Sequence, residues 1–228
     1  MSPLFNMERY VPDFSIEKDL AGRGYRYIAG IDEAGRGALA GPLGIGLVIY
    51  SPDIFDDIPQ RITESVNDSK QLSHKKRVAA LGIISEYALC SLSVCIPHTV
   101  IDRLNINGAT EFGIRRLIEK SAVRPDVLII DGNYRFRFDI PSVPVIKGDS
   151  RSFSIASASI VAKVRRDHIM DKIDARYPGY GFCGNKGYGT ASHLSAIEAT
   201  GFSSVHRKSY DPVRSMLEGQ GKLFDESI

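Results

Sequence analysis

Three apolar segments of the chain are each followed by carboxylates. Asp32 and Glu33 follow the first segment, Asp131 follows the second, and Asp149 comes shortly after the third. Open α/β sheets place their ligands at the ends of strands, so these acidic side chains are candidates for one site. If the first two segments are neighbouring strands, Asp32 and Asp131 lie close together at one edge of the sheet.

Carboxylates gathered at one point repel one another unless a positive charge lies between them, and the sequence places no basic residue there that obviously neutralises them. Mg²⁺ and Mn²⁺ prefer such oxygen ligands. Two such ions about 3.5–4 Å apart can align a water and a leaving oxygen on one phosphate. The alternative is that each acid is only a turn residue or a helix cap. The pattern favours a metal-dependent nuclease, because an acid beside a buried strand needs a partner.

A glycine-rich segment, residues 35–41, follows the first pair of acids. It is similar to a dinucleotide-binding loop, but in that fold the glycines open a helix. Here a Gly-Pro pair and a second apolar run follow instead, and two acids precede the glycines where a pyrophosphate would lie. We expect Gly35 and Gly37 to let backbone amides approach a sugar or phosphate.

Apolar periodicity predicts the elements that position these residues. A hairpin joins the first two strands, and Ser73 and Ser152 are expected helix caps. The segments 51–70 and 179–190 look like loops, and small residues near 156–159 permit close packing on a sheet. The predicted strands are residues 27–32, 43–50, 87–96, 127–130 and 143–146. The predicted helices are residues 15–23, 73–85, 98–120 with a break near Asn107-Gly108, 152–177, and 191–200.

Five strands with helices between them predict an α/β fold, with a central mixed sheet flanked by helices. The chain has 228 residues, 43% of them hydrophobic, which is enough for one large domain or for one domain with a small appendage. The formal charge is only +2, with local basic clusters at residues 165–166 and 206–208 that suit phosphate binding. The alternative for these charges is ordinary surface solubility.

Composition also bears on the compartment. Cys90, Cys95 and Cys183 have no disulfide-framework spacing, and the first two lie in an apolar run as expected for reduced core residues. No window reaches the ~18 apolar residues of a membrane helix, and the first residues lack a leader pattern. We therefore expect a cytoplasmic protein with no membrane contact.

The motifs, taken in order, resemble those of bacterial ribonuclease HII. Each is weak alone, but the ordered set is specific and spans residues 25–212. The first five motifs are Asp-Glu-Ala-Gly-Arg-Gly from Asp32, Asn-Asp-Ser-Lys at 67–70, Ile-Asp-Gly at 130–132, Gly-Asp at 148–149 and Ala-Ser-Ile-Val-Ala-Lys-Val-x-Arg-Asp at 158–167. The last two are Lys-Gly-Tyr-Gly-Thr at 186–190 and His-Arg-x-Ser-Tyr at 206–210, where the family often has Phe in place of Tyr210.

The resemblance implies a ribonuclease H-like fold and assigns roles to residues of this chain. The implied metal ligands are Asp32, Glu33, Asp131 and Asp149, and the residues that read the ribose 2′-hydroxyl are Gly35, Arg36, Gly37 and Tyr188. Lys70, Lys163 and Arg207 are expected to contact phosphates. The alternatives are a half-buried packing tyrosine at 188 and solvated charges at the three basic positions.

The resemblance also implies cleavage of RNA in RNA–DNA hybrids and nicking at single ribonucleotides in duplex DNA. We hypothesise hydrolysis with two Mn²⁺ or Mg²⁺ ions, Asp32 bridging both, leaving 3′-hydroxyl and 5′-phosphate ends. The expected parts are an N-terminal arm (1–24), too short for the extra domain of ribonuclease HIII, a catalytic domain (25–178), a C-terminal helical substrate-binding segment (179–212) and a tail (213–228). We expect a monomer.

The tail contains a Gln-x-x-Leu-Phe pattern formed by Gln220, Leu223 and Phe224. It resembles short peptides that dock on the bacterial sliding clamp, and an exposed Leu-Phe pair suits an apolar groove. The alternative is that both apolar residues pack on the domain.

Two other functions are weighed against this one. Another two-metal nuclease of the same fold has no reason to carry the Gly-Arg-Gly loop together with Tyr188. A non-catalytic nucleic-acid binder needs only basic residues, and four carboxylates facing a polyanion would weaken it.

Overall fold

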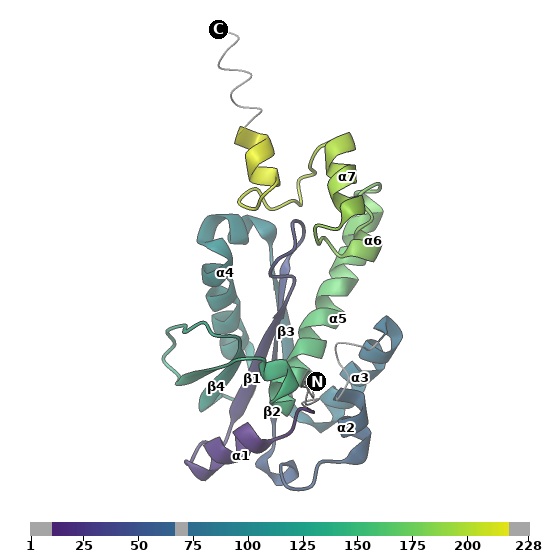
Figure 1. The fold of residues 1–228 in the computed structure, drawn as a ribbon. Coiled ribbons are helices and arrows are strands. Elements are labelled where there is room, and N and C mark those ends of the chain that lie inside the picture. Colours follow the sequence, from purple (N-terminus) through teal and green to yellow (C-terminus); the bar gives the residue numbers. More distant parts are fainter. Residues whose placement is uncertain (1–10, 67–72, 219–228) are drawn as a thin grey trace, which may run out of the picture.

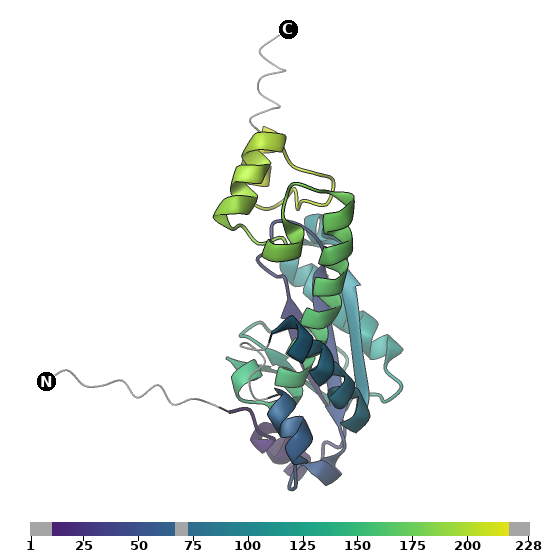
Figure 2. The same ribbon diagram turned by 90° about the vertical axis from the view of Figure 1, so that its right-hand side faces the viewer.

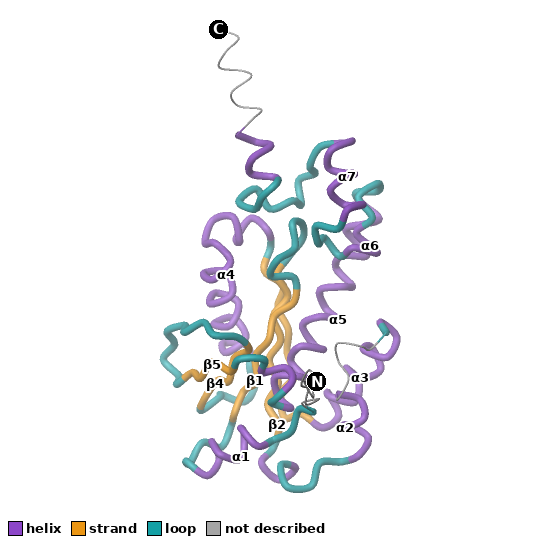
Figure 3. Tube along the Cα trace, viewed as in Figure 1, coloured by secondary structure: helices purple, strands orange, loops and turns teal. Residues whose placement is uncertain are grey.

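The computed structural model describes residues 11–66 and 73–218, and a five-stranded sheet forms its centre (Figures 1 and 3). The strand order is β3-β2-β1-β4-β5. β1 runs antiparallel to β2 and parallel to β4, so the sheet is mixed, as predicted. The strands are β1 (Ile28–Ala34), β2 (Leu43–Tyr50), β3 (Ala88–Ile96), β4 (Val127–Asp131) and β5 (Ser142–Val145).

Helices cover both faces of this sheet (Figure 3). Every residue of β2 is buried and β1 is nearly so, as a central strand between two helical layers requires. α4 (His98–Lys120) packs on one face. The other face is covered by α5 (Phe153–Arg176) together with α1 (Ser15–Gly22), α2 (Gln60–Val66) and α3 (His74–Tyr87).

α5 lies unusually close to the two central strands. A Cβ at Gly46 would lie 2.2 Å from the carbonyl oxygen of Ala158, and one at Gly30 would lie 2.3 Å from the carbonyl carbon of Ser154. Glycines on the strands and small residues on the helix therefore permit the contact that the small-residue stretch predicted.

The C-terminal segment lies at the far end of α5 (Figure 2) and holds the connection between β1 and β2. It contains α6 (Phe182–Asn185) and α7 (Ala191–Thr200). The Leu39 N–H donates to the Gly187 carbonyl at 2.8 Å, and the Arg207 N–H donates to the Leu39 carbonyl at 2.8 Å. Two residues from far along the chain, Gly187 and Arg207, therefore hydrogen-bond to the backbone of the glycine-rich connection.

Several boundaries differ from the predictions. The segment 51–70 was expected to be a loop, but it contains a 3₁₀ turn (Pro52–Ile54) and α2, whose Ile62 and Val66 are fully buried at helical spacing. The break in α4 falls at Asn105, which has φ 56° and accepts from the N–H groups of Asn107 and Gly108. Residues 182–185 and 213–218 are helical where a loop and a tail were expected.

Two expectations from composition can be compared with the described residues. Within residues 11–66 and 73–218, the structure has no helix with the length and apolarity to cross a membrane. The three cysteines are free thiols, as predicted: Cys90 is buried, Cys95 is half-buried and Cys183 is exposed.

Candidate active site

The register of the parallel strands brings the first two acidic positions together. Ile31 of β1 pairs with Ile130 of β4, so Asp32 and Asp131 are the next residues on adjacent strands. Asp32 is 6% exposed, and its Oδ1 accepts the Glu33 N–H at 2.7 Å. The predicted juxtaposition of these two carboxylates is therefore confirmed.

The third acidic position joins them through a turn after β5. The Gly148 N–H donates to Asp131 Oδ1 at 2.6 Å, and the next residue, Asp149, lies in the 3₁₀ turn Gly148–Ser150 and is 9% exposed. Lys147 adopts a left-handed conformation, φ 53°, that opens this turn. The backbone hydrogen bond to Asp131 fixes the place where Asp149 enters the site.

Burial, and then mutual repulsion, raise the pKa values of Asp32, Glu33 and Asp131. Burial raises the pKa of Asp32 well above its usual range, and the charges of Glu33 and Asp131 add to it against a hydrogen bond from Ser159. Burial is also the main cause of the raised pKa of Glu33 and of Asp131, with Asp149 adding to the latter. This excess of negative charge is the electrostatic signature of a cation site.

The donor set fits a hard divalent cation, because it offers buried carboxylate oxygens. Within the described part of the chain, however, no three acidic, histidine or cysteine side chains already form a metal-holding group. Arg36 Nη1 lies 3.4 Å from Glu33 Oε1, and its charge opposes the rise in the pKa of Glu33. The prediction that no basic residue neutralises the acids is therefore wrong for Glu33.

Tyr188 lies directly beside the glycine-rich loop. Its hydroxyl oxygen accepts the Gly35 N–H at 3.1 Å, and its side chain is partly exposed. Tyr188 and Glu33 both line a pocket of about 260 Å³, together with Ser159 and Lys163. The structure thus places Tyr188, which is bonded to the loop amide of Gly35, and the Glu33 carboxylate on one cavity.

The Arg36 side chain turns away from this cavity toward α4. It hydrogen-bonds the side chains of Asn107 and Thr110, and its guanidinium carbon lies 4.4 Å from the centre of the Tyr134 ring. A Cβ at Gly37 would meet no atom within 4 Å, so the loop backbone there faces open space. The backbone of this loop, more than the Arg36 side chain, is available to a ligand.

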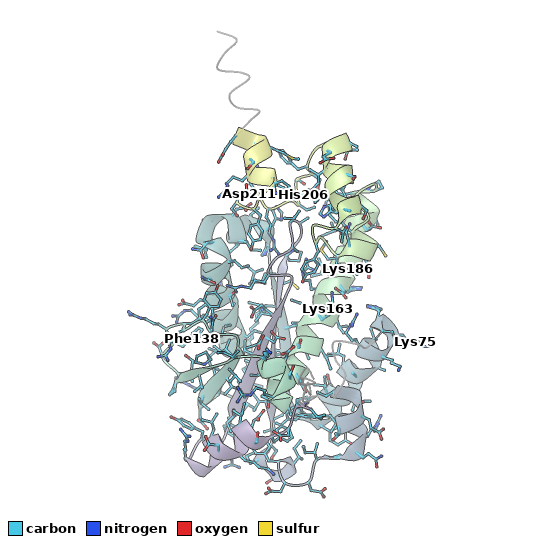
Figure 4. All side chains as sticks on the ribbon, viewed as in Figure 1. Lys75, Phe138, Lys163, Lys186, His206 and Asp211 are labelled. Atoms are coloured by element: carbon cyan, nitrogen blue, oxygen red, sulfur yellow. The ribbon has the colours of Figure 1, made fainter. Side chains whose placement is uncertain are left out.

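The three residues that were expected to contact phosphates differ in where the structure places them. Lys163, on the middle of α5 (Figure 4), lines the pocket while its Nζ lies 2.7 Å from Asp167 Oδ1. Lys70 lies outside the described residues. Arg207 is fully buried and donates to backbone carbonyls, which contradicts a phosphate contact. Arg166 and His206 are buried too, so each basic cluster has one exposed member, Arg165 or Lys208.

Two buried histidines support Tyr188 and were not predicted from the sequence. The Ser203 N–H donates to His206 Nδ1 at 2.9 Å, which leaves the His206 Nε2–H to donate to His193 Nε2 at 3.1 Å. His193 Nδ1–H then donates to the Tyr188 carbonyl at 2.9 Å. Two neutral imidazoles therefore link Ser203 to Tyr188 within the C-terminal segment (His206 is labelled in Figure 4). The only sign of this pair in the sequence was His193, a histidine within a largely apolar predicted helix.

Comparison with known proteins assigns the family. The family model described as Ribonuclease HII matches residues 29–213. The chain is 43% identical over 215 residues to the ribonuclease HII of Carboxydothermus hydrogenoformans, covering 94% of this chain and 89% of that protein. It is 40% identical over 225 residues to that of Listeria innocua, covering 99% and 79%.

The fold agrees with this assignment. The ribonuclease HII in a complex with PCNA from Archaeoglobus fulgidus superposes with a TM-score of 0.67 at 21% identity, covering 81% of this chain and 95% of that one. The Bst ribonuclease HIII solved with Mn²⁺ gives 0.59 at 18%, covering 85% and 70%. The fold is therefore that of the ribonucleases H of this type. This chain belongs to the ribonuclease HII family, and it is an endonuclease that hydrolyses RNA strands.

Proposed function

We propose that this enzyme cleaves the RNA strand of RNA–DNA hybrids and also nicks duplex DNA on the 5′ side of a single embedded ribonucleotide. The cut would leave a 3′-hydroxyl and a 5′-phosphate. The observation that carries the proposal is the hydrogen bond between Tyr188 and Gly35, beside a pocket that Glu33 also lines. A sensor of one 2′-hydroxyl beside the hydrolytic carboxylates suffices for a substrate with only one ribose.

The exposed tyrosine ring offers a face on which a deoxyribose can stack. Its hydroxyl already accepts the Gly35 N–H, so it keeps its own proton to donate. A 2′-hydroxyl that accepts this proton would be held between Tyr188 and the Gly35–Gly37 backbone. A 2′-deoxyribose leaves these polar groups without their partner, and this is the physical basis of the discrimination.

Asp32, Glu33, Asp131 and Asp149 are the residues that would hold two divalent ions, Mn²⁺ or Mg²⁺. When bound, the ions supply Lewis-acid stabilisation of the phosphate and lower the pKa of the attacking water. The related Mn²⁺-bound ribonuclease HIII supports the choice of ion.

The test uses three labelled duplexes of one sequence: an RNA–DNA hybrid, a DNA duplex with one ribonucleotide, and the all-DNA duplex. Each is incubated with Mg²⁺, Mn²⁺ or EDTA, and the cut is mapped at nucleotide resolution. We expect cleavage of the first two duplexes only, a single nick 5′ to the ribonucleotide, and none in EDTA. A nick on the 3′ side, or cleavage confined to the hybrid, would disprove the single-ribonucleotide activity.

The end chemistry has its own readout. A polymerase should extend the upstream product directly because it ends in a 3′-hydroxyl. Phosphatase should slow the downstream product on a gel because it begins with a phosphate. Products that resist both enzymes would contradict metal-assisted attack by water.

A partner contact is proposed from the sequence of residues 219–228, the part of the tail that lies outside the described residues. Gln220, Leu223 and Phe224 match a clamp-docking pattern, and the Archaeoglobus ribonuclease HII was solved with a sliding clamp. We propose that residues 216–228 bind the bacterial clamp. A labelled peptide should bind it in fluorescence anisotropy, and Leu223→Ala with Phe224→Ala should abolish this. Equal binding by both peptides would exclude the contact. Monomeric state remains a prediction, to be measured by light scattering.

A further inference from the structure

Two arginines lie completely buried beneath the connection between β1 and β2. Arg166, from α5, and Arg207, from the segment after α7, each have 0% exposure. A buried guanidinium destabilises the fold unless its donors find acceptors. Here both side chains donate hydrogen bonds to backbone carbonyls of residues 35–42, and Arg166 Nη1 is buried without a hydrogen-bond partner.

Arg207 ties the two ends of the glycine-rich loop to one planar group. Its Nη1 donates to the Arg36 carbonyl at 2.8 Å, and its Nη2 donates to the Gly35 carbonyl at 2.7 Å. The same side chain reaches the Gly41 and Pro42 carbonyls, each at 3.2 Å. Residues 35–36 and 41–42 are thereby fixed relative to each other, although no β-ladder bond joins them.

Arg166 fixes the loop relative to Tyr188. Its Nε donates to the Pro42 carbonyl at 2.8 Å, and its guanidinium carbon lies 5.5 Å from the centre of the Tyr188 ring. A Cβ at Gly35, where φ is +86°, would lie 1.9 Å from Arg166 Nε. Only glycine lets the loop rest on this side chain, so the position of the Gly35 amide follows from that of Arg166.

We propose that Arg166 and Arg207 are positioning residues for 2′-hydroxyl recognition, and this rests on the function proposed above. They hold the Gly35–Gly37 backbone and the Tyr188 ring as one preorganised surface. A single hydroxyl gives little binding energy, so its recognition depends on donors and acceptors that are already in place. Arginine is required because its fixed fork of donors reaches several carbonyls, whereas lysine carries its donors on one atom.

A purely structural role predicts something different. Loosening a fold lowers the affinity for every duplex by the same factor. Loosening the sensor lowers the affinity only for the duplex that carries the ribose. The measured quantity is therefore the ratio of Kd for an all-DNA duplex to Kd for the same duplex with one ribonucleotide, in an Asp131→Asn background that prevents cleavage.

Arg207→Lys and Arg166→Lys keep the charge and remove the fork. We expect each to lower the ratio about tenfold while the Kd for the all-DNA duplex changes less than about threefold. Leu117→Ala, at a fully buried position on α4, is the control that destabilises the fold elsewhere. Melting temperatures establish that every variant is folded at the assay temperature.

Three outcomes overturn the inference. An unchanged ratio in both folded lysine variants excludes positioning, and an equal fall of the ratio in Leu117→Ala shows a general stability effect. A parent protein with a ratio of one shows that the proposed function itself fails, and this inference with it. If neither lysine variant folds, Tyr210→Phe decides, because it removes only one hydrogen bond to the Arg36 carbonyl, 2.9 Å long. We then expect about a twofold lower ratio, and no change counts against the inference.

Discussion

The hydroxyl oxygen of Tyr188 accepts a hydrogen bond of 3.1 Å from the backbone N–H of Gly35, a residue 153 positions earlier in the chain. This contact joins the C-terminal segment to the strand that carries Asp32 and Glu33. In the proposed function, recognition by Tyr188 and hydrolysis at the carboxylates are therefore coupled through this one hydrogen bond.

Removing only the hydroxyl should separate recognition from stacking. Tyr188→Phe keeps the ring and loses the bond to Gly35, and we expect about a tenfold fall in kcat/KM for a single-ribonucleotide duplex. Tyr177→Phe is a matched control, since it removes a hydroxyl at the end of α5 that is bonded to Ser204 of the same segment at 2.7 Å. Steady-state cleavage kinetics measure both. Equal losses in the two variants would exclude a sensing role for Tyr188.

Asp131→Asn should stop catalysis without disturbing the fold. The asparagine oxygen can still accept the Gly148 N–H, a bond of 2.6 Å, so the turn that carries Asp149 keeps its place. We expect turnover to fall at least about a thousandfold because a charged ligand is lost, with hybrid affinity changed less than about threefold. Single-turnover cleavage and anisotropy measure the two quantities, with the exposed Asp139→Asn as control. Near-normal turnover would remove Asp131 from the site.

Asp32→Asn should make the metal-free protein more stable. Burial and the neighbouring charges of Glu33 and Asp131 raise the pKa of Asp32, so its carboxylate is an unfavourable charge in the absence of a cation. In EDTA we expect a gain of about 0.5–2 kcal/mol, or a few degrees in Tm.

The same melting experiment tests the metal. Added Mn²⁺ should raise the Tm of the parent protein and of the exposed control Asp57→Asn, but not that of Asp32→Asn. A lower Tm for Asp32→Asn in EDTA would show that the carboxylates do not strain the fold. An equal Mn²⁺ response would place the ion elsewhere.

The histidine pair makes stability depend on pH. Burial, and then the neighbouring His193, lower the pKa of His206 to about 4 from 6.5. Between these values the unfolded chain binds a proton that the folded protein excludes, so stability falls as pH falls through this window. From pH 7 to pH 5 we expect a loss on the order of 1–2 kcal/mol.

Urea denaturation at a series of pH values measures this loss. His206→Gln should be less stable at pH 7, because the chain from Ser203 to Tyr188 is broken, and should show a shallower pH dependence. The exposed His168→Gln serves as the control and should keep the slope of the parent protein. A parent slope that survives His206→Gln would assign the effect to other groups.

The local pattern of the sequence was sufficient to predict the buried strands of the sheet and the acidic residues at their ends. The apolar runs that end at Asp32 and Asp131 predicted two buried strands, because burial on both faces demands continuous apolar residues whatever the partner strand is. Helix caps such as Ser73 and Ser152 were also predictable, because a cap bonds to backbone three residues away. The short helix that contains Ile62 and Val66 was not predicted, because two apolar positions are too few to define a helical period.

Only the tertiary structure decided what the charged residues do. Arg207 lies in a basic run that suggested a phosphate contact, yet its guanidinium binds the carbonyls of Gly35 and Arg36 in the core. In the structure Glu33 is paired with Arg36, a contact that the sequence did not predict. A charged side chain is stabilised by whichever groups the fold brings within hydrogen-bonding distance, and these come from loops far apart in the chain. Periodicity records which segments are buried, but it carries no information about such pairings.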